Sequence, residues 1–150
     1  NSGVNILDNA ANNFYLTEIQ VEVGTVATEF ERIPHSTQLA KCQRYYEKSY
    51  NYADAPGTST TDSKWARILG AAVSTFYRDS INFRTTKRTG APTVTIYSVT
   101  GASGNVRLNN SSDLAITQED NGQTSGSYYM NRSWSAGDFI WFHYVAEDEL

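Results

Sequence analysis

The last strand candidate of the chain places the tightest constraint on its fold. In "DFIWFHYVA", residues 138–146, two apolar sets alternate along an extended strand, with Phe139, Trp141 and Val145 on one face and Ile140, Phe142 and Tyr144 on the other. A strand that is apolar on both faces has to be covered on both. The facing sheet of a β-sandwich is the first predicted cover, and a neighbouring subunit is the second.

Turn residues divide the chain between residues 64 and 150 into a succession of strand candidates. The separators "RTGAP", "TGASG", "EDNG" and "SAGD" are typical of hairpins and loops. This spacing predicts a mainly β fold, an antiparallel sandwich of jelly-roll type. The predicted strands are Trp65–Tyr77, Ser80–Thr86, Thr93–Val99, Asn105–Asn109, Leu114–Gln118, Ser127–Trp134 and Phe139–Ala146.

One helix is predicted, in "STQLAKCQRYYEKSY", residues 36–50. Ser36 follows Pro34 closely and is a suitable N-cap. A helix of about twelve residues is marginal alone, so packing must stabilise it. Its apolar stripe is predicted to lie on its own domain or on copies of itself about an axis. The stripe consists of Leu39, Cys42, Tyr46 and Tyr50.

The first part of the chain, residues 14–31, reads as two short strands. Ile19, Val21 and Val23 alternate with polar residues, and Gly24 interrupts the pattern before "VATEFE" resumes it. Two strands do not make a stable sheet by themselves, so they need partners from elsewhere. The predicted organisation is the terminal strands of a preceding sandwich over 1–34, a connector helix and loop over 35–63, and a C-terminal sandwich over 64–150. The chain is expected to come from the middle of a longer protein.

Charge and composition exclude several classes of function. The net charge is −4, and the basic cluster Arg84, Lys87 and Arg88, predicted to be a solvated strand end, is too small for a nucleic-acid footprint. No apolar run approaches the roughly 18 residues that would predict membrane insertion. The single cysteine forbids an intrachain disulfide, and Cys42 is predicted to be a small buried hydrophobic residue.

Motifs for catalysis, cofactors or metals are absent from the sequence. It contains no nucleophile elbow, phosphate loop, dinucleotide fingerprint or Cys/His metal cluster. His143 lies within the last strand and is predicted to be packed or interfacial rather than catalytic. The chain is therefore predicted not to be an enzyme and to need no cofactor.

Binding chemistry is the remaining prediction. Aromatic rings beside polar turns stack on sugar rings while neighbouring amides bond the hydroxyl groups. Each such ring has a second interpretation, as core or interface filler, and both stay open at this point. The candidate glycan-binding residues are Trp65, Tyr128, Tyr129 and Trp134.

Three segments, in order, resemble one family of proteins. "FYLTEIQVEVGTVATEFERIP" resembles the closing strand of the carbohydrate-binding-like sandwich of many bacteriophage tail fibres and tailspikes, and "LAKCQRYYEKSY" resembles the "CQRYY" helix that follows it there. "RTGAPTVTIYSVTGASGNVR" and the terminal "HYVAEDEL" resemble the strand core and acidic end of the C-terminal knob. The stretch "FRTTKR" departs from the family pattern, which puts the face of that strand in doubt.

The resemblance implies a trimeric sandwich at the distal tip of an extracellular virion fibre, with bacterial surface polysaccharide as its partner. The alternatives are a carbohydrate-binding module of a glycan-degrading enzyme and a purely structural trimerisation clamp. By the resemblance the helix is a connector collar. The predicted trimer-interface or core residues are Leu39, Cys42, Tyr46, Trp141, Phe142 and Tyr144.

Overall fold

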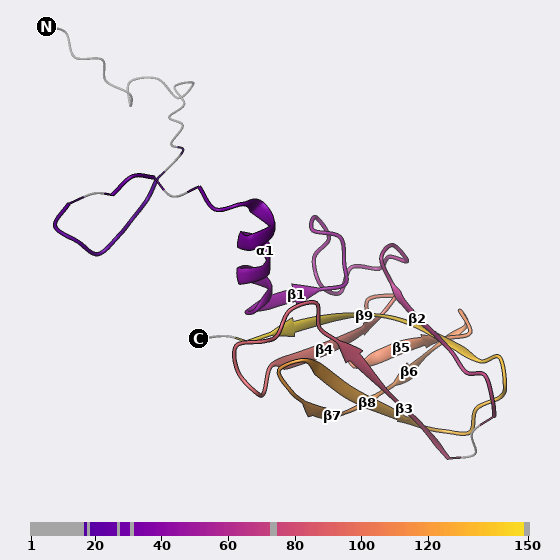
Figure 1. Ribbon diagram of the computed structural model, residues 1–150. Coiled ribbons are helices and arrows are strands. Elements are labelled where there is room, and N and C mark those ends of the chain that lie inside the picture. Colours follow the sequence, from indigo (N-terminus) through magenta and orange to yellow (C-terminus); the bar gives the residue numbers. More distant parts are fainter. Residues whose placement is uncertain (1–16, 18, 27, 31, 73–74, 149–150) are drawn as a thin grey trace, which may run out of the picture. The chain divides into compact units, whose positions relative to one another are not determined.

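A computed structural model describes residues 17, 19–26, 28–30, 32–72 and 75–148 of the chain. The chain divides into two compact units, Asn1–Pro34 and His35–Leu150, each described by itself below (Figure 1). The described part is mainly β, with antiparallel sheets and a single short helix.

The larger sheet of the second unit is organised around its last strand, β9. This strand pairs antiparallel with four others: β1, β2, β4 and β5. The strand β6 then extends the sheet by pairing with β5. The strands of this six-stranded sheet are β1 (Tyr46–Lys48), β2 (Trp65–Ile68), β4 (Thr93–Ser98), β5 (Asn105–Leu108), β6 (Ser112–Ala115) and β9 (Phe139–Glu147).

The second sheet has three strands in the order β3 (Phe76–Asn82), β8 (Ser125–Asn131) and β7 (Thr117–Asn121). The two sheets enclose one hydrophobic core between them (Figure 1). Period-two alternation decides which side chains enter it, because successive residues of a strand point to opposite faces. The fully buried core residues include Ile81, Val106, Ile140, Phe142, Tyr144 and Ala146.

One glycine fixes how the turn after β4 packs. Gly101 has φ +93°, a conformation that residues with a Cβ rarely adopt. A Cβ at this position would also overlap the backbone carbonyl oxygen of Gly57. The close approach of the two glycines therefore lets the loop that precedes β2 lie against the β4–β5 turn.

The helix α1 (His35–Gln43) is shorter than predicted, and the four-residue stripe is wrong. Tyr46 begins β1 and pairs with Glu147 of β9, so neither Tyr46 nor Tyr50 lies on the helix. The chain leaves the helix to pair with β9 from Tyr46 onward, and this path buries the ring of Tyr50. No residue of α1 is buried, and Cys42, predicted to be buried, is exposed.

Two predicted strand boundaries are also wrong. The candidate Trp65–Tyr77 is not one strand: β2 ends at Ile68 before Gly70, and β3 begins at Phe76. The candidate Ser80–Thr86 ends early, because the backbone N–H of Arg84 donates to the carboxylate of Glu47 instead of to a sheet partner. The segment "FRTTKR" is therefore a loop after Asn82.

The candidate Leu114–Gln118 belongs to two sheets. β6 ends at Ala115 in the six-stranded sheet, and β7 begins at Thr117 in the three-stranded one. The chain crosses between the sheets at Ile116, whose N–H donates to the carbonyl of Gly104 at 3.0 Å. Periodicity alone did not reveal this crossing.

The second face of β9 is covered largely by the chain itself. His143 and Val145 are buried, and the ring of Tyr50 stacks on His143 with centroids 4.1 Å apart. A neighbouring subunit is therefore not needed over this half of the strand, contrary to the expectation from the sequence. The segment 49–60 provides the cover.

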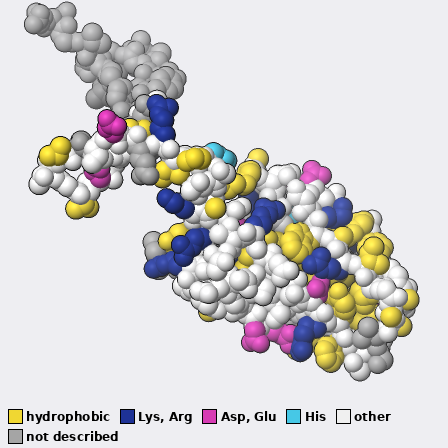
Figure 2. All heavy atoms as spheres, in the orientation of Figure 1, with side chains coloured by type: hydrophobic (Ala, Val, Ile, Leu, Met, Phe, Trp, Pro, Cys, Tyr) yellow, Lys and Arg dark blue, Asp and Glu magenta, His cyan; other side chains and the backbone are white. Residues whose placement is uncertain are grey.

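The other half of this face carries an apolar patch, here called the Trp141 patch and made of Ile68, Phe139 and Trp141. The rings of Phe139 and Trp141 are half-buried with centroids 5.0 Å apart, and Ile68 opposite Phe139 is 74% exposed. Hydrophobic side chains gather on the surface at the end of this unit where β2 lies (Figure 2). The ammonium of Lys64 lies 4.5 Å from the Trp141 ring centroid.

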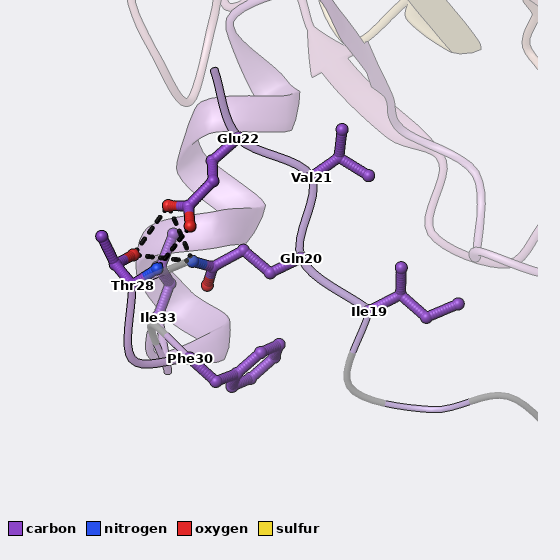
Figure 3. Close-up of a pocket in the computed structure, with 7 residues that line it drawn as sticks. All are labelled: Ile19, Gln20, Val21, Glu22, Thr28, Phe30 and Ile33. Atoms are coloured by element: carbon purple, nitrogen blue, oxygen red, sulfur yellow. Dashed lines mark hydrogen bonds between the residues drawn. The ribbon is translucent and has the colours of Figure 1, made fainter. Parts of the chain in front are cut away.

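In the first unit, no strand occurs among the described residues, so the two-strand prediction is wrong there; the rest of residues 14–31 lies outside the described ranges. Gln20, Glu22 and Thr28 turn toward one another and share hydrogen bonds, while Ile19 and Val21 point away from them (Figure 3). Val21 is 93% exposed. The pocket here has a volume of about 370 Å³ and an exposed lining. The alternating apolar face therefore lacks a cover within the described residues.

Candidate functional site

The four aromatic residues predicted to bind glycans do not form one site. Tyr128 is 1% exposed and Trp134 is 3% exposed, so both belong to the core. The Trp134 ring packs at 5.7 Å from Tyr77. Of the two interpretations left open for Trp134, the structure agrees with the core one, because the ring points inward just after β8.

Trp65 is half-buried at the edge of the core. Its ring contacts Tyr144 edge to face at a centroid distance of 5.3 Å, and the guanidinium of Arg67 lies 4.9 Å from its centroid. Arg67 in turn bonds Asp79 of the opposite sheet at 2.6 Å. The Arg67–Asp79 ion pair joins the two sheets beside Trp65, which packs against the core.

Tyr129 differs from the other three, because it lies on the outer face of the three-stranded sheet. Its neighbour Tyr128 points into the core, and the alternation of β8 places Tyr129 on the opposite side. Phe76 of β3 lies beside it, 46% exposed, with ring centroids 6.2 Å apart and planes inclined at 69°. The two rings form a small apolar surface open to solvent.

An ion pair borders these rings. Arg78 is opposite Tyr129 in the β3–β8 ladder, and its Nε and Nη2 atoms each lie 2.7 Å from an oxygen of Glu119 in β7. The guanidinium also lies 5.5 Å from the Phe76 ring centroid. Phe76, Arg78, Glu119 and Tyr129 line a shallow pocket of about 270 Å³, here called the Tyr129 site.

Short hydroxyl and amide side chains surround the Tyr129 site on the same sheet face. Ser80 and Ser127 are opposite each other, two residues along the ladder from the Arg78–Tyr129 pair. Asn131 is opposite Phe76. Thr117 of β7 is opposite Tyr129 on its other side. The face therefore combines two stacking rings, one ion pair and a polar rim.

Sequence reasoning found one of the four residues that line this pocket. Phe76 was placed in a strand without a role, Arg78 fell between two predicted strands, and Glu119 was placed in a turn. Arg78 and Glu119 are 41 residues apart, and only the strand order β3-β8-β7 brings them across Tyr129. The adjacent aromatic residues Phe76 and Tyr77 were the one available signal, since alternation along a strand points one of the two rings away from the core.

The residues predicted for the trimer interface or core separate into two groups. Phe142 and Tyr144 are core residues, each 0% exposed. Leu39 and Trp141 are half-buried at the surface, whereas Cys42 and Tyr46 are exposed. The surface group is spread over α1, β1 and β9.

His143 is hydrogen-bonded on both ring nitrogens in a site closed to solvent. Ser49 Oγ lies 3.2 Å from its Nδ1, and the Thr60 carbonyl lies 3.1 Å from its Nε2. Burial is the main cause that lowers the pKa of His143, which holds the imidazole neutral. Since His143 and Ser49 are both buried, this pair is structural.

The described part of the chain shows neither a metal-binding group nor a membrane-spanning helix. Among residues 17–148, leaving aside the few that are not described, no group of three or more His, Cys, Asp or Glu side chains is arranged to hold a metal ion. No helix in the described ranges has the length and apolar character needed to cross a bilayer.

Comparison with known proteins adds no relative to this description. No family model, curated protein or solved structure matches the chain. The geometry of the Tyr129 site and the resemblance carried by the sequence motifs are therefore the basis for function.

Proposed function

We propose that this chain is the non-catalytic C-terminal module of a phage tail fibre or tailspike, a homotrimer of jelly-roll type at the distal tip that binds glycans of the host surface. The observation that carries the glycan proposal is the exposed Phe76–Tyr129 ring pair beside the Arg78–Glu119 ion pair. The ordered motif resemblance supports the fibre assignment.

The chemistry of the Tyr129 site fits a sugar better than a fully apolar ligand. Ring faces take up the C–H surface of a pyranose, and charged and hydroxyl groups fix its orientation. The pocket is shallow and holds only part of one saccharide chain. A single such site binds weakly, and three copies on one trimer raise the effective affinity by avidity.

The proposed trimer is supported by surface apolar groups that the single chain leaves uncovered. These are the Trp141 patch and Leu39 of α1, a helix none of whose residues is buried. Exposed apolar patches of this kind mark interaction surfaces. A trimerisation clamp without a ligand is the second candidate function, and the Trp141 patch is the observation that favours it.

The experiment compares Tyr129→Ala with Tyr52→Ala on an array of bacterial surface oligosaccharides. Tyr52 is 75% exposed and lies outside the Tyr129 site, so it is a matched control for loss of a surface ring. Wild type and Tyr52→Ala are expected to bind a common set of glycans, and Tyr129→Ala to lose it while keeping the wild-type melting temperature. Equal binding by all three proteins would contradict the Tyr129 site and favour the clamp.

A further inference from the structure

We propose that the Tyr129 site selects uncharged sugars with adjacent hydroxyl groups and discriminates against acidic sugars. This inference rests on the proposed glycan-binding function and names the class of sugar. The geometry that carries it is the closed, two-bond contact between Arg78 and Glu119.

The cation of the site is already neutralised. Both Nε and Nη2 of Arg78 bond the Glu119 carboxylate at 2.7 Å, a bidentate arrangement that is among the strongest side-chain pairings. An acidic sugar could bond the same guanidinium edge only by displacing Glu119. The side chain of Glu119 is 21% exposed, so a displaced carboxylate would stay near the incoming acid.

The surrounding charge also opposes an acidic ligand. The chain as a whole carries a net charge of −4. Like charges in proximity are unfavourable, and they lower the rate at which an anion approaches. No feature of the Tyr129 site compensates for this repulsion, because its one cation is paired.

An uncharged diol meets the opposite situation. A guanidinium has five N–H groups, and Glu119 accepts two of them, so further N–H groups remain to donate to sugar oxygens. Each carboxylate oxygen has a second lone pair that accepts from a sugar hydroxyl. Two adjacent hydroxyl groups bridge donor and acceptor without breaking the ion pair, while Phe76 and Tyr129 contact the ring.

The test titrates the protein with two sets of small probes and follows the backbone amide NMR signals of Phe76 and Tyr129. The uncharged set is the methyl glycosides of glucose, galactose and mannose, and the acidic set is the methyl glycosides of glucuronic acid and N-acetylneuraminic acid. At least one uncharged probe is expected to shift both signals at millimolar concentration. The acidic probes are expected to bind at least about tenfold more weakly, and raising the salt is expected to leave the uncharged binding unchanged.

Glu119→Gln is the diagnostic variant. It keeps the shape of the side chain but leaves Arg78 with an uncompensated positive charge, so binding of an acidic probe is expected to rise about tenfold while uncharged binding falls. Tyr52→Ala serves as the control and is expected to keep the wild-type preference. A melting curve checks that Glu119→Gln remains folded.

The two proposals fail in different ways. Tighter binding of an acidic probe to the wild type at Phe76 and Tyr129 would overturn the selectivity and leave glycan binding intact. No shift at these residues with either set would overturn the Tyr129 site itself. If folded Glu119→Gln keeps the wild-type preference for uncharged over acidic probes, the ion pair is not what discriminates between the two kinds of sugar.

Discussion

At the scale of single residues, Trp134 and Tyr129 show how little a local pattern says about exposure. Both are aromatic residues close to the polar turn that follows β8. Tyr129 lies on the outer face of that strand, whereas Trp134 follows the strand and turns back onto Tyr77 in the core. The two rings therefore differ in role: Trp134 packs in the core, and Tyr129 is the ring proposed for binding.

Trp134→Ala is expected to lower the free energy of unfolding by about 3–5 kcal/mol, because it removes a buried indole and leaves a cavity. Tyr129→Ala is expected to change it by less than about 1 kcal/mol, since its ring is partly solvated. Chemical denaturation of both variants measures the difference. A wild-type midpoint for Trp134→Ala would contradict the placement of this ring.

Glu47 and Lys87 form a buried ion pair that the sequence did not reveal. Lys87, predicted to be solvated, is 1% exposed and bonds Glu47 at 2.8 Å and the Gln43 carbonyl at the end of α1 at 2.6 Å. The Tyr144 hydroxyl donates to Glu47 at 2.6 Å, and burial followed by this bond raises the pKa of Tyr144. The network joins α1, β1 and β9.

Lys87→Met is expected to destabilise the fold by about 3–5 kcal/mol, because it leaves the Glu47 carboxylate buried and unpaired. The double variant Glu47→Gln with Lys87→Met is expected to recover part of this loss, because the neutral amide oxygen still accepts from the buried Tyr144 hydroxyl. A double-mutant cycle from urea denaturation gives the coupling. Additive losses in the cycle would show that the two charges do not interact.

At the scale of elements, β9 depends on the segment 49–60 for its second cover. Tyr50 stacks on His143, and Ser49 Oγ accepts from the N–H of Tyr144 while it bonds His143 Nδ1. Protonation of His143 would put a proton on Nδ1 and a charge in a buried site. Lys64 also opposes that charge, whereas Asp54 favours it.

The stability of the fold is expected to fall as the pH is lowered below the ordinary histidine pKa of about 6.5. The folded state lowers the pKa of His143, so the unfolded chain binds the proton first. The stabilisation is fully present above the unfolded pKa and is lost as the pH falls through the folded pKa. Urea midpoints between pH 8 and 5 measure it. The control variant His35→Gln, at an exposed helix position, should leave the dependence of stability on pH unchanged. If His143→Gln does not reduce this dependence, His143 is not its origin.

Removal of residues 142–150 is expected to abolish folding of the second unit. The deletion takes Phe142 and Tyr144 from the core and ends the pairing of β9 with β1 and β4. Burial of each large apolar side chain stabilises by roughly 1.5–3 kcal/mol, so the loss approaches the whole stability of a small domain. Circular dichroism measures the outcome. A folded truncated chain with the wild-type melting temperature would contradict the central place of β9.

At the scale of the whole molecule, the question is what covers the apolar groups that one chain leaves at its surface. The two-sided character of β9 argues for a subunit only over the Trp141 patch, since the chain covers the half around His143 and Val145. The proposed trimer therefore rests on a smaller surface than the sequence indicated.

Light scattering of the protein at micromolar concentration is expected to give three times the mass of one chain. Ile68→Lys, which places a charge in the Trp141 patch, is expected to shift the mass toward one chain without a change in the folded core, because Ile68 is 74% exposed. Ser80→Lys, on the outer face of the other sheet, is the matched control and should stay trimeric. A wild-type mass of one chain would contradict the trimer.

Local physics made much of the fold predictable. Turn residues and period-two alternation located β4, β5, β8 and β9 to within a few residues, because strand register and turn conformation depend on neighbouring residues. The mainly β class followed from the same signals, and the single helix followed from the N-cap at Ser36 and helical spacing of apolar residues. Boundaries failed at Tyr46, Gly70 and Ile116, where pairing with a distant strand or a change of sheet decided the structure.

What the sequence determined by itself is which residues alternate and where the chain turns. What only the tertiary structure decided is which of the two faces of each strand is covered. It placed Lys87 against Glu47, Tyr50 over His143, and Phe76 and Arg78 beside Tyr129 across three strands. The physical reason is that burial and pairing depend on contacts between residues far apart in the chain, and no local pattern encodes the order in which strands join a sheet.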